Sequence, residues 1–221
     1  MTMQTNNINQ APNINQAPNI NQANKATLFF LDNFDSFTYN LVDQFKTAGY
    51  PVKIYRNNQS AEQIKAHIDA CEGEVVLVLS PGPGTPSAAG CMIDLITLCK
   101  GQVPILGICL GHQALIEQYG GVVGQADEIQ HGKSSLIAHC ADKMFTGLSQ
   151  PLSVARYHSL VGTSVPASLE IVAQYNGMCM SIYHEHDKVI GFQFHPESIL
   201  TCEGAQLLEN SLNLLTAKEN K

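Results

Sequence analysis

The feature that most constrains the fold is a cysteine between two glycines, in Gly107-Ile108-Cys109-Leu110-Gly111. An apolar run at 103–106 precedes it, and a helix-like stretch at 112–119 follows it. A strand, a tight turn and a helix in this order form the elbow that lifts a nucleophile out of the end of a sheet. Gly107 and Gly111 omit the Cβ atoms where the turn is tight and the strand packs on the helix. The pattern therefore predicts an α/β fold with a reactive cysteine at a strand end.

The first half of the chain alternates short apolar runs with amphipathic stretches, which is typical of a parallel sheet covered on both faces. Asp35 or Ser36 is expected to cap the first helix, and Gly49 to end it. Strands are expected at 28–31, 52–55, 75–79 and 105–108, and helices from about residue 37 to 48 and at 61–70, 91–100 and 112–119.

The pattern changes after Gly120, where short β-like runs follow one another. We expect these runs to form antiparallel hairpins that extend the sheet, followed by a closing helix from Glu203 to about Ala217. The β-like runs lie at 134–138, 152–157, 169–174, 178–184 and 189–194. The predicted fold class is α/β, with an open, mostly parallel sheet covered by helices on both faces and an antiparallel β extension in the C-terminal half.

Residues 1–24 form a tail in which Asn-Ile-Asn-Gln-Ala-Pro recurs with a period of six. A segment rich in Asn, Gln and Pro cannot bury a core, so we expect it to be disordered and dispensable for catalysis. It lacks the basic and apolar regions of a signal peptide. Residues 25–221 are predicted to form one domain.

Composition excludes several function classes. The net charge is −7 and there is no basic block, so nucleic acid and anionic membranes are poor partners. No apolar run approaches the ~20 residues that span a bilayer. Seven scattered cysteines without a C-x-x-C pair indicate reduced thiols in a cytoplasmic protein, with no disulfide frame and no zinc site. The run His184-Glu185-His186-Asp187 is interpreted as a hairpin tip rather than a metal site.

A second motif, Phe194-His195-Pro196-Glu197, follows a predicted strand far downstream of the elbow. An imidazole and a carboxylate separated by one residue can lie side by side beyond a strand end. His195 would take the proton of Cys109 and later give it to a leaving amine, while Glu197 would orient the ring. A Cys-His-Glu triad that attacks a carbonyl carbon is therefore the leading hypothesis.

The loop Ser80-Pro81-Gly82-Pro83-Gly84-Thr85-Pro86 follows the third predicted strand. A stiff loop at the carboxyl edge of a parallel sheet is a usual place for a ligand, and its N–H groups could complete an oxyanion hole with that of Leu110. It matches no phosphate-binding motif. The segment Tyr157-His158-Ser159-Leu160 is a further candidate for substrate contact, and His131-Gly132-Lys133 is either structural or faces a partner.

From about Thr27 to Leu215, these motifs in this order closely resemble the class I (triad-type) glutamine amidotransferases. The run from Leu31 to Asn40, the loop, the elbow, His131-Gly132-Lys133, 156–160 and 192–200 carry the resemblance. It implies Cys109 as nucleophile, His195 as base and Glu197 as its orienter, with a γ-glutamyl thioester and released ammonia. It implies the following glutamine-binding residues: Gly82, Pro83, Gly84, Leu110, Gln113, Ser159 and Leu160.

Within the family the resemblance is to glutaminase subunits that pass ammonia to a chorismate-binding synthase subunit, without any cofactor in this chain. Residues 42–45 and 154–156 look more like the tryptophan-pathway form than the folate-pathway form, and one subunit serving both remains an alternative. The loops that carry His131 and Ser159 are expected to form part of the interface. Two other classes stay open, a thiol hydrolase that acts alone and a non-catalytic subunit, and the intact Cys109, His195 and Glu197 argue against the latter.

Overall fold

The computed structural model describes residues 25–126 and 132–218 of the chain. The predicted tail, residues 1–24, lies outside the described residues, and so does His131. A nine-stranded sheet forms the centre, with the strand order β2-β1-β3-β4-β11-β10-β9-β6-β7. The α/β class with a mostly parallel first half is confirmed.

The elements lie close to their expected positions along the chain. The strands of the large sheet are β1 Thr27–Asp32, β2 Val52–Arg56, β3 Val75–Leu79, β4 Ile105–Ile108, β6 Lys133–His139, β7 Leu152–Arg156, β9 Glu170–Tyr175, β10 Met178–His184 and β11 Val189–Phe192. The α-helices are α1 Thr38–Thr47, α2 Ala61–Asp69, α3 Met92–Cys99, α4 Leu110–Gln118 and α5 Gly204–Thr216. Two short 3-10 helices, η1 Pro86–Ala88 and η2 Lys143–Phe145, lie in the connections.

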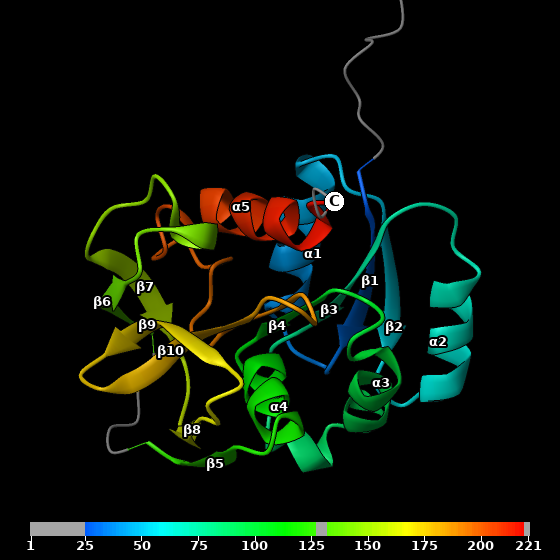
Figure 1. The fold of residues 1–221 in the computed structure, drawn as a ribbon, viewed down its shortest axis with the longest axis horizontal. Coiled ribbons are helices and arrows are strands. Elements are labelled where there is room, and N and C mark those ends of the chain that lie inside the picture. Colours follow the sequence, from blue (N-terminus) through cyan, green and yellow to red (C-terminus); the bar gives the residue numbers. More distant parts are fainter. Residues whose placement is uncertain (1–24, 127–131, 219–221) are drawn as a thin grey trace, which may run out of the picture.

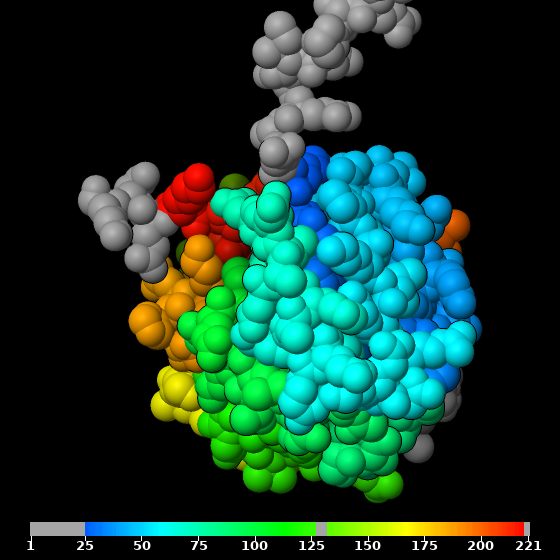
Figure 2. Space-filling model, turned by 90° about the vertical axis from the view of Figure 1, so that its right-hand side faces the viewer, coloured from blue at the N-terminus to red at the C-terminus, as the bar shows by residue number. Residues whose placement is uncertain are grey.

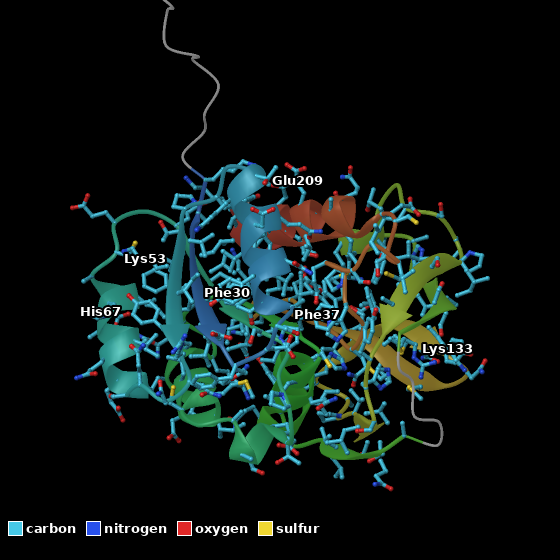
Figure 3. All side chains as sticks on the ribbon, turned by 180° about the vertical axis from the view of Figure 1, so that it is seen from behind. Phe30, Phe37, Lys53, His67, Lys133 and Glu209 are labelled. Atoms are coloured by element: carbon cyan, nitrogen blue, oxygen red, sulfur yellow. The ribbon has the colours of Figure 1, made fainter. Side chains whose placement is uncertain are left out.

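Helices cover both faces of the sheet (Figure 1). On one face, α1 and α5 pack their apolar sides on β1, β3, β4 and β11, where Phe30 meets Phe45 at a ring-centroid distance of 6.5 Å. Figure 3 labels Phe30 at this layer. On the other face, α2, α3 and α4 bury residues that include Ile64, Leu95 and Leu115. Seen from the side of α2, the segment around β2 and α2 covers a large part of the surface (Figure 2).

The predicted antiparallel hairpins are present, β10 with β11 among them, but β11 also pairs in parallel with β4, which was not predicted. Val189 to Phe192 pairs antiparallel with β10 but parallel with β4, in the register Gly191–Gly107 and Phe192–Ile108. The hairpin turn after β10 sends the chain back in the direction of β4, so β11 completes the parallel half. This matters for the site, because β4 and β11 now end side by side at the same edge.

Two further details differ from the sequence prediction. Phe37, not Asp35 or Ser36, is the N-cap residue of α1, although the Asp35 carboxylate accepts a hydrogen bond from the Phe37 N–H at 2.7 Å. Two short strands, β5 Val122–Gln125 and β8 Leu160–Ser164, were not expected and form a small antiparallel sheet of their own.

Two predictions concern a metal site at residues 184–187 and a membrane-spanning segment. Residues 185–188 form the turn between β10 and β11, as predicted for a hairpin tip, and no three His, Cys, Asp or Glu side chains of the described residues gather as a metal site. Within the same residues, no helix has both the length and the apolar character to cross a membrane.

Candidate active site

Cys109 lies at the turn between β4 and α4 in a backbone conformation that non-glycine residues rarely adopt. Its φ is 51° and its ψ is −98°. Such a conformation costs roughly 1–3 kcal/mol and persists only where the surroundings enforce it. Here the N–H of Cys109 donates to the carbonyl of Phe192 at 2.7 Å, which continues the pairing of β4 with β11. The predicted strand–cysteine–helix elbow is therefore present.

The glycines on either side of Cys109 permit the elbow to pack. A Cβ atom on Gly107 would come within 2.6 Å of the Leu115 side chain and 2.7 Å of the Gly111 carbonyl carbon. A Cβ atom on Gly111 would come within 2.6 Å of both the Cβ and the carbonyl oxygen of Leu79. Larger residues at either position would push α4 away from the sheet and would displace Cys109.

His195 and Glu197 form a buried pair just beyond the end of β11. Nδ1 of His195 donates to Oε1 of Glu197 at 2.6 Å, and the two residues are 2% and 5% exposed. The other ring nitrogen, Nε2, is buried and has no hydrogen-bond partner among the described residues. With Nδ1 held by the carboxylate, Nε2 is the nitrogen available to Cys109. Hydrogen bonds of catalytic groups are often loose until substrate binds.

The electrostatics favour a charged imidazole. Burial alone lowers the pKa of His195, but the sulfur of Cys109 and the carboxylate of Glu197 raise it to about 10. At neutral pH the site therefore favours an imidazolium beside the sulfur, and such a cation stabilises a thiolate. Cys109 also precedes the N-terminus of α4, whose partial positive charge acts in the same direction.

Aromatic rings and a threonine fix the position of His195. Its ring lies 5.3 Å from that of Phe37 and 5.2 Å from that of Tyr157 in an edge-on arrangement. Figure 3 labels Phe37 near the middle of the molecule, where the parallel half meets the β-rich half. The backbone N–H of His195 donates to the Ala155 carbonyl at 3.0 Å, and the Thr201 hydroxyl donates to the His195 carbonyl at 2.7 Å. These contacts hold the ring and its backbone in place.

Two further histidines near the site are held neutral. Burial lowers the pKa of His112 to about 3, and burial and the charge of Arg156 lower the pKa of His158 to about 4. Nε2 of His158 accepts a hydrogen bond from Nε of Arg156 at 3.2 Å. Neither ring is therefore a cation at neutral pH, which leaves His195 as the charged histidine of this cluster.

The predicted glycine-rich loop lies against the elbow. A Cβ atom on Gly82 would lie 2.6 Å from the Leu110 side chain and 2.6 Å from Cβ of Asn33, so the loop contacts both. The N–H of Asn33 donates to the Ser80 hydroxyl at 2.8 Å, and its side-chain amide donates to the Ser80 carbonyl at 3.0 Å. These bonds join the loops that follow β1 and β3. Beyond Gly82, Pro83 and Gly84 are exposed.

The remaining predicted contacts lie on two other elements. Gln113, on α4, is 3% exposed, and its side-chain amide donates to the Leu160 carbonyl at 2.9 Å. Leu160 begins β8 and is half-buried, while Ser159 before it is exposed. The structure thus connects Gln113 to Leu160 directly and brings Gly82 to Leu110.

Three residues that contact the site were not predicted from the sequence. Gln193 is completely buried and its side-chain amide donates to the sulfur of Cys109 at 3.8 Å. Phe37 was expected only as the start of the helix at 37–48, and no prediction involves Thr201. The sequence does indicate a role for Gln193, because it is a polar residue between Phe192 and Phe194 at the end of a predicted buried strand. Phe37 and Thr201 gave no comparable signal.

Comparison with known proteins is consistent with this geometry. The family model for glutamine amidotransferase class-I matches residues 29–214. Anthranilate synthase component 2 of Vibrio parahaemolyticus is 56% identical over 195 residues, which cover 88% of this chain and 99% of the relative. The protein of the same name from Haemophilus influenzae is 52% identical over 86% of this chain and 98% of its own length.

Solved structures share the fold at lower identity. The structure of a putative GMP synthase subunit from Thermoplasma acidophilum superimposes with a TM-score of 0.73 at 22% identity, over 86% of this chain and 94% of that one. A glutamine amidotransferase from Thermotoga maritima gives a TM-score of 0.64 at 15% identity, over 87% of this chain and 99% of that one. The family match over most of the sequence, together with the cysteine elbow and the paired histidine and glutamate, shows that this chain belongs to the class I glutamine amidotransferases.

Proposed function

We propose that this chain is the glutaminase subunit of anthranilate synthase, which releases ammonia from glutamine for a chorismate-binding synthase subunit in tryptophan biosynthesis. The assignment to this synthase follows from relatives named anthranilate synthase component 2 that match over nearly their whole length. The chemistry depends on one structural observation, the strained elbow of Cys109 at the same sheet edge as the buried His195–Glu197 pair.

In the first step the thiolate of Cys109 attacks the side-chain amide carbon of glutamine, and the C=O electrons move to oxygen. When the tetrahedral intermediate collapses, the C–N bond breaks and the imidazolium of His195 gives its proton to the leaving nitrogen, which departs as ammonia. A γ-glutamyl thioester remains. His195 then takes a proton from water, whose oxygen attacks the thioester carbon, and glutamate leaves as the C–S bond breaks. Glu197 keeps the imidazole oriented throughout.

The oxyanion that forms in both steps needs fixed N–H donors. Leu110 begins α4, so its N–H belongs to the first turn, where helical N–H groups have no partner within the helix. Gly82 is in contact with the Leu110 side chain, so its loop lies beside the same point. We assign the oxyanion hole to the N–H groups of Leu110 and Gly82.

We assign glutamine binding to the space between the loop and β8. The backbone of Gly82, Pro83 and Gly84 would form one wall. Gln113, Ser159 and Leu160 would form the other, with the Gln113–Leu160 hydrogen bond setting its shape. This chemistry requires no metal or cofactor, because the thiol, the imidazole and the backbone donors carry out every step.

Ammonia in neutral water is mostly protonated and no longer nucleophilic, so the acceptor subunit has to cover the site. Exposed apolar side chains lie on the His195 segment and on the loop and helix that contact it. Ile199 is 92% exposed two residues after Glu197, and Leu200 is 37% exposed. On the neighbouring loop and α1, Phe34 and Tyr39 are 52% and 65% exposed. We propose these side chains, together with Lys133 and Ser159, both exposed, as the contact with the synthase subunit.

Replacing Ile199 with aspartate is expected to weaken binding to the synthase subunit by about tenfold or more, because a charge would be buried in an apolar contact. The measurement is a binding isotherm with the purified synthase subunit. Ile54, on the far edge strand β2, is also exposed, so Ile54→Asp is the matched control and should bind like the parent. Equal affinity of Ile199→Asp and the parent would remove Ile199 from the interface.

The alternative is service to the folate pathway through aminodeoxychorismate synthase, alone or in addition. The test is to mix the chain with each of the two synthase subunits, chorismate and glutamine, and to identify the product. Anthranilate formation that depends on this chain is the expected result. If only the aminodeoxychorismate synthase subunit gained glutamine-dependent activity, the assignment to tryptophan biosynthesis would be wrong. Full glutaminase turnover without any partner would instead favour a thiol hydrolase that acts alone.

A further inference from the structure

We infer that Gln193 is a thiolate-stabilising residue of the reaction: its side-chain amide donates a hydrogen bond to Cys109 and is aligned for this by Gln113. The inference rests on the proposed thiolate chemistry. It starts from the register of the parallel pair β4 and β11, in which Phe192 lies beside Ile108. Cys109 and Gln193, the next residue of each strand, therefore lie side by side at the ends of β4 and β11.

The contact itself is direct and protected from water. Nε2 of Gln193 lies 3.8 Å from Sγ of Cys109, within the range of an N–H···S hydrogen bond. Gln193 is completely buried, and its backbone N–H donates to the Met180 carbonyl at 2.9 Å, which anchors it to β10. A hydrogen bond to a charged acceptor is stronger than one to a neutral acceptor, and more so away from water. The donor therefore favours the thiolate over the thiol.

A chain of hydrogen bonds decides which end of the Gln193 amide faces the sulfur. The Leu160 carbonyl can only accept, so Gln113 must direct its NH₂ group there, at 2.9 Å. The same NH₂ group donates to Oε1 of Gln193 at 3.3 Å. The oxygen of Gln193 is thereby fixed toward Gln113, and its NH₂ group toward Cys109. The reversed amide would place two NH₂ groups against each other.

This chain of hydrogen bonds also connects the proposed substrate site to the nucleophile. Gln113 and Leu160 are among the residues assigned to glutamine binding, and they are the first two members of the chain that ends at Cys109. Glutamine bound in contact with Gln113 would restrict the side-chain amide of Gln193 to the orientation in which it donates to Cys109. Gln193 thus supplies the sulfur with a neutral donor, while His195 supplies it with a cation.

The test compares two variants of nearly the same shape. Gln193→Met removes the donor, and Gln193→Glu replaces it with an acceptor that bears a negative charge. For each, the rate of Cys109 alkylation by iodoacetamide is followed against pH in the isolated chain. The readout is mass spectrometry of the peptide that contains Cys109, because Cys140 and Cys202 are exposed and would also react. We expect the pH of half-maximal rate to rise by about one unit in Gln193→Met, equivalent to about 1.4 kcal/mol, and further in Gln193→Glu. Glutamine-dependent kcat in the complex should fall about tenfold in Gln193→Met, with KM changed less.

Two controls keep the result interpretable. Ser181 is a completely buried polar residue on the neighbouring strand β10, and Ser181→Ala should show the parent's alkylation profile. Ammonia-dependent synthesis by the complex should persist in both Gln193 variants if they fold and assemble. An alkylation profile identical to the parent's in both variants would overturn the inference, even if turnover fell. A parent complex that failed to use glutamine would instead reject the proposed function, whatever the alkylation profiles showed.

Discussion

Replacing Cys109 with alanine is expected to abolish glutamine-dependent anthranilate synthesis while leaving ammonia-dependent synthesis intact. Without the sulfur, no thioester can form, and His195 and the oxyanion donors cannot replace a missing nucleophile. The loss of a nucleophile from such a set reduces turnover by roughly 10³-fold or more. The synthase subunit can still react with ammonia added at high pH, because its own site is unchanged. The measurement is anthranilate formation by the complex with each nitrogen source.

The strain at the elbow makes this variant easier to interpret. Alanine has the Cβ atom of cysteine and retains the same unfavourable φ of 51°, so it neither relieves the strain nor adds to it. The complex should therefore assemble as the parent does. Alkylation by a reactive glutamine analogue should label the parent once and should not label the variant. Loss of synthesis with ammonia as well would mean that the change had damaged assembly rather than chemistry, and the variant would then say nothing about the nucleophile.

The parallel half of the fold was predictable because its strands are short apolar runs with glycine-rich ends. Val75–Leu79 and Ile105–Ile108 were predicted to the residue. The parallel pairing of β11 with β4 could not be predicted, because a buried strand has the same apolar pattern whether its neighbours are parallel or antiparallel. The small sheet of β5 and β8 was missed for a different reason. Both strands are short, and Gly124 and Gly162 interrupt their apolar pattern.

The sequence predicts those parts of the site that belong to short local motifs. The elbow of Cys109 and the His195–Glu197 spacing are local, and the structure brings these residues to one edge. The contribution of Gln193 is not local, because it depends on β11 lying parallel to β4. Its burial is a product of the same pairing. The contacts of Phe37 and Thr201 with His195 likewise arise from long-range packing, which no spacing in the sequence records.

Gly204 is a place where a single methyl group should disable the site from outside it. Gly204 begins α5 and is buried, and a Cβ atom there would collide with the carbonyl oxygen of Pro196. Pro196 stands between His195 and Glu197, and its backbone cannot give way like a flexible side chain. Gly204→Ala must therefore move the start of α5 or the catalytic segment by roughly 1 Å, and a displacement of that size can cost about 100-fold in rate.

We expect Gly204→Ala to lower glutamine-dependent kcat by about 100-fold and the free energy of unfolding by about 1–3 kcal/mol, the usual cost of overpacking. Ammonia-dependent synthesis should be retained, since the synthase subunit's own site is unchanged. Ala205 is exposed at the next position of α5, so Ala205→Ser controls for changes to the helix itself. The measurements are turnover with both nitrogen sources and urea unfolding of the isolated chain. Parent-like glutamine turnover in Gly204→Ala would mean that the start of α5 yields without moving His195, and the contact with Pro196 would then have no part in positioning the pair.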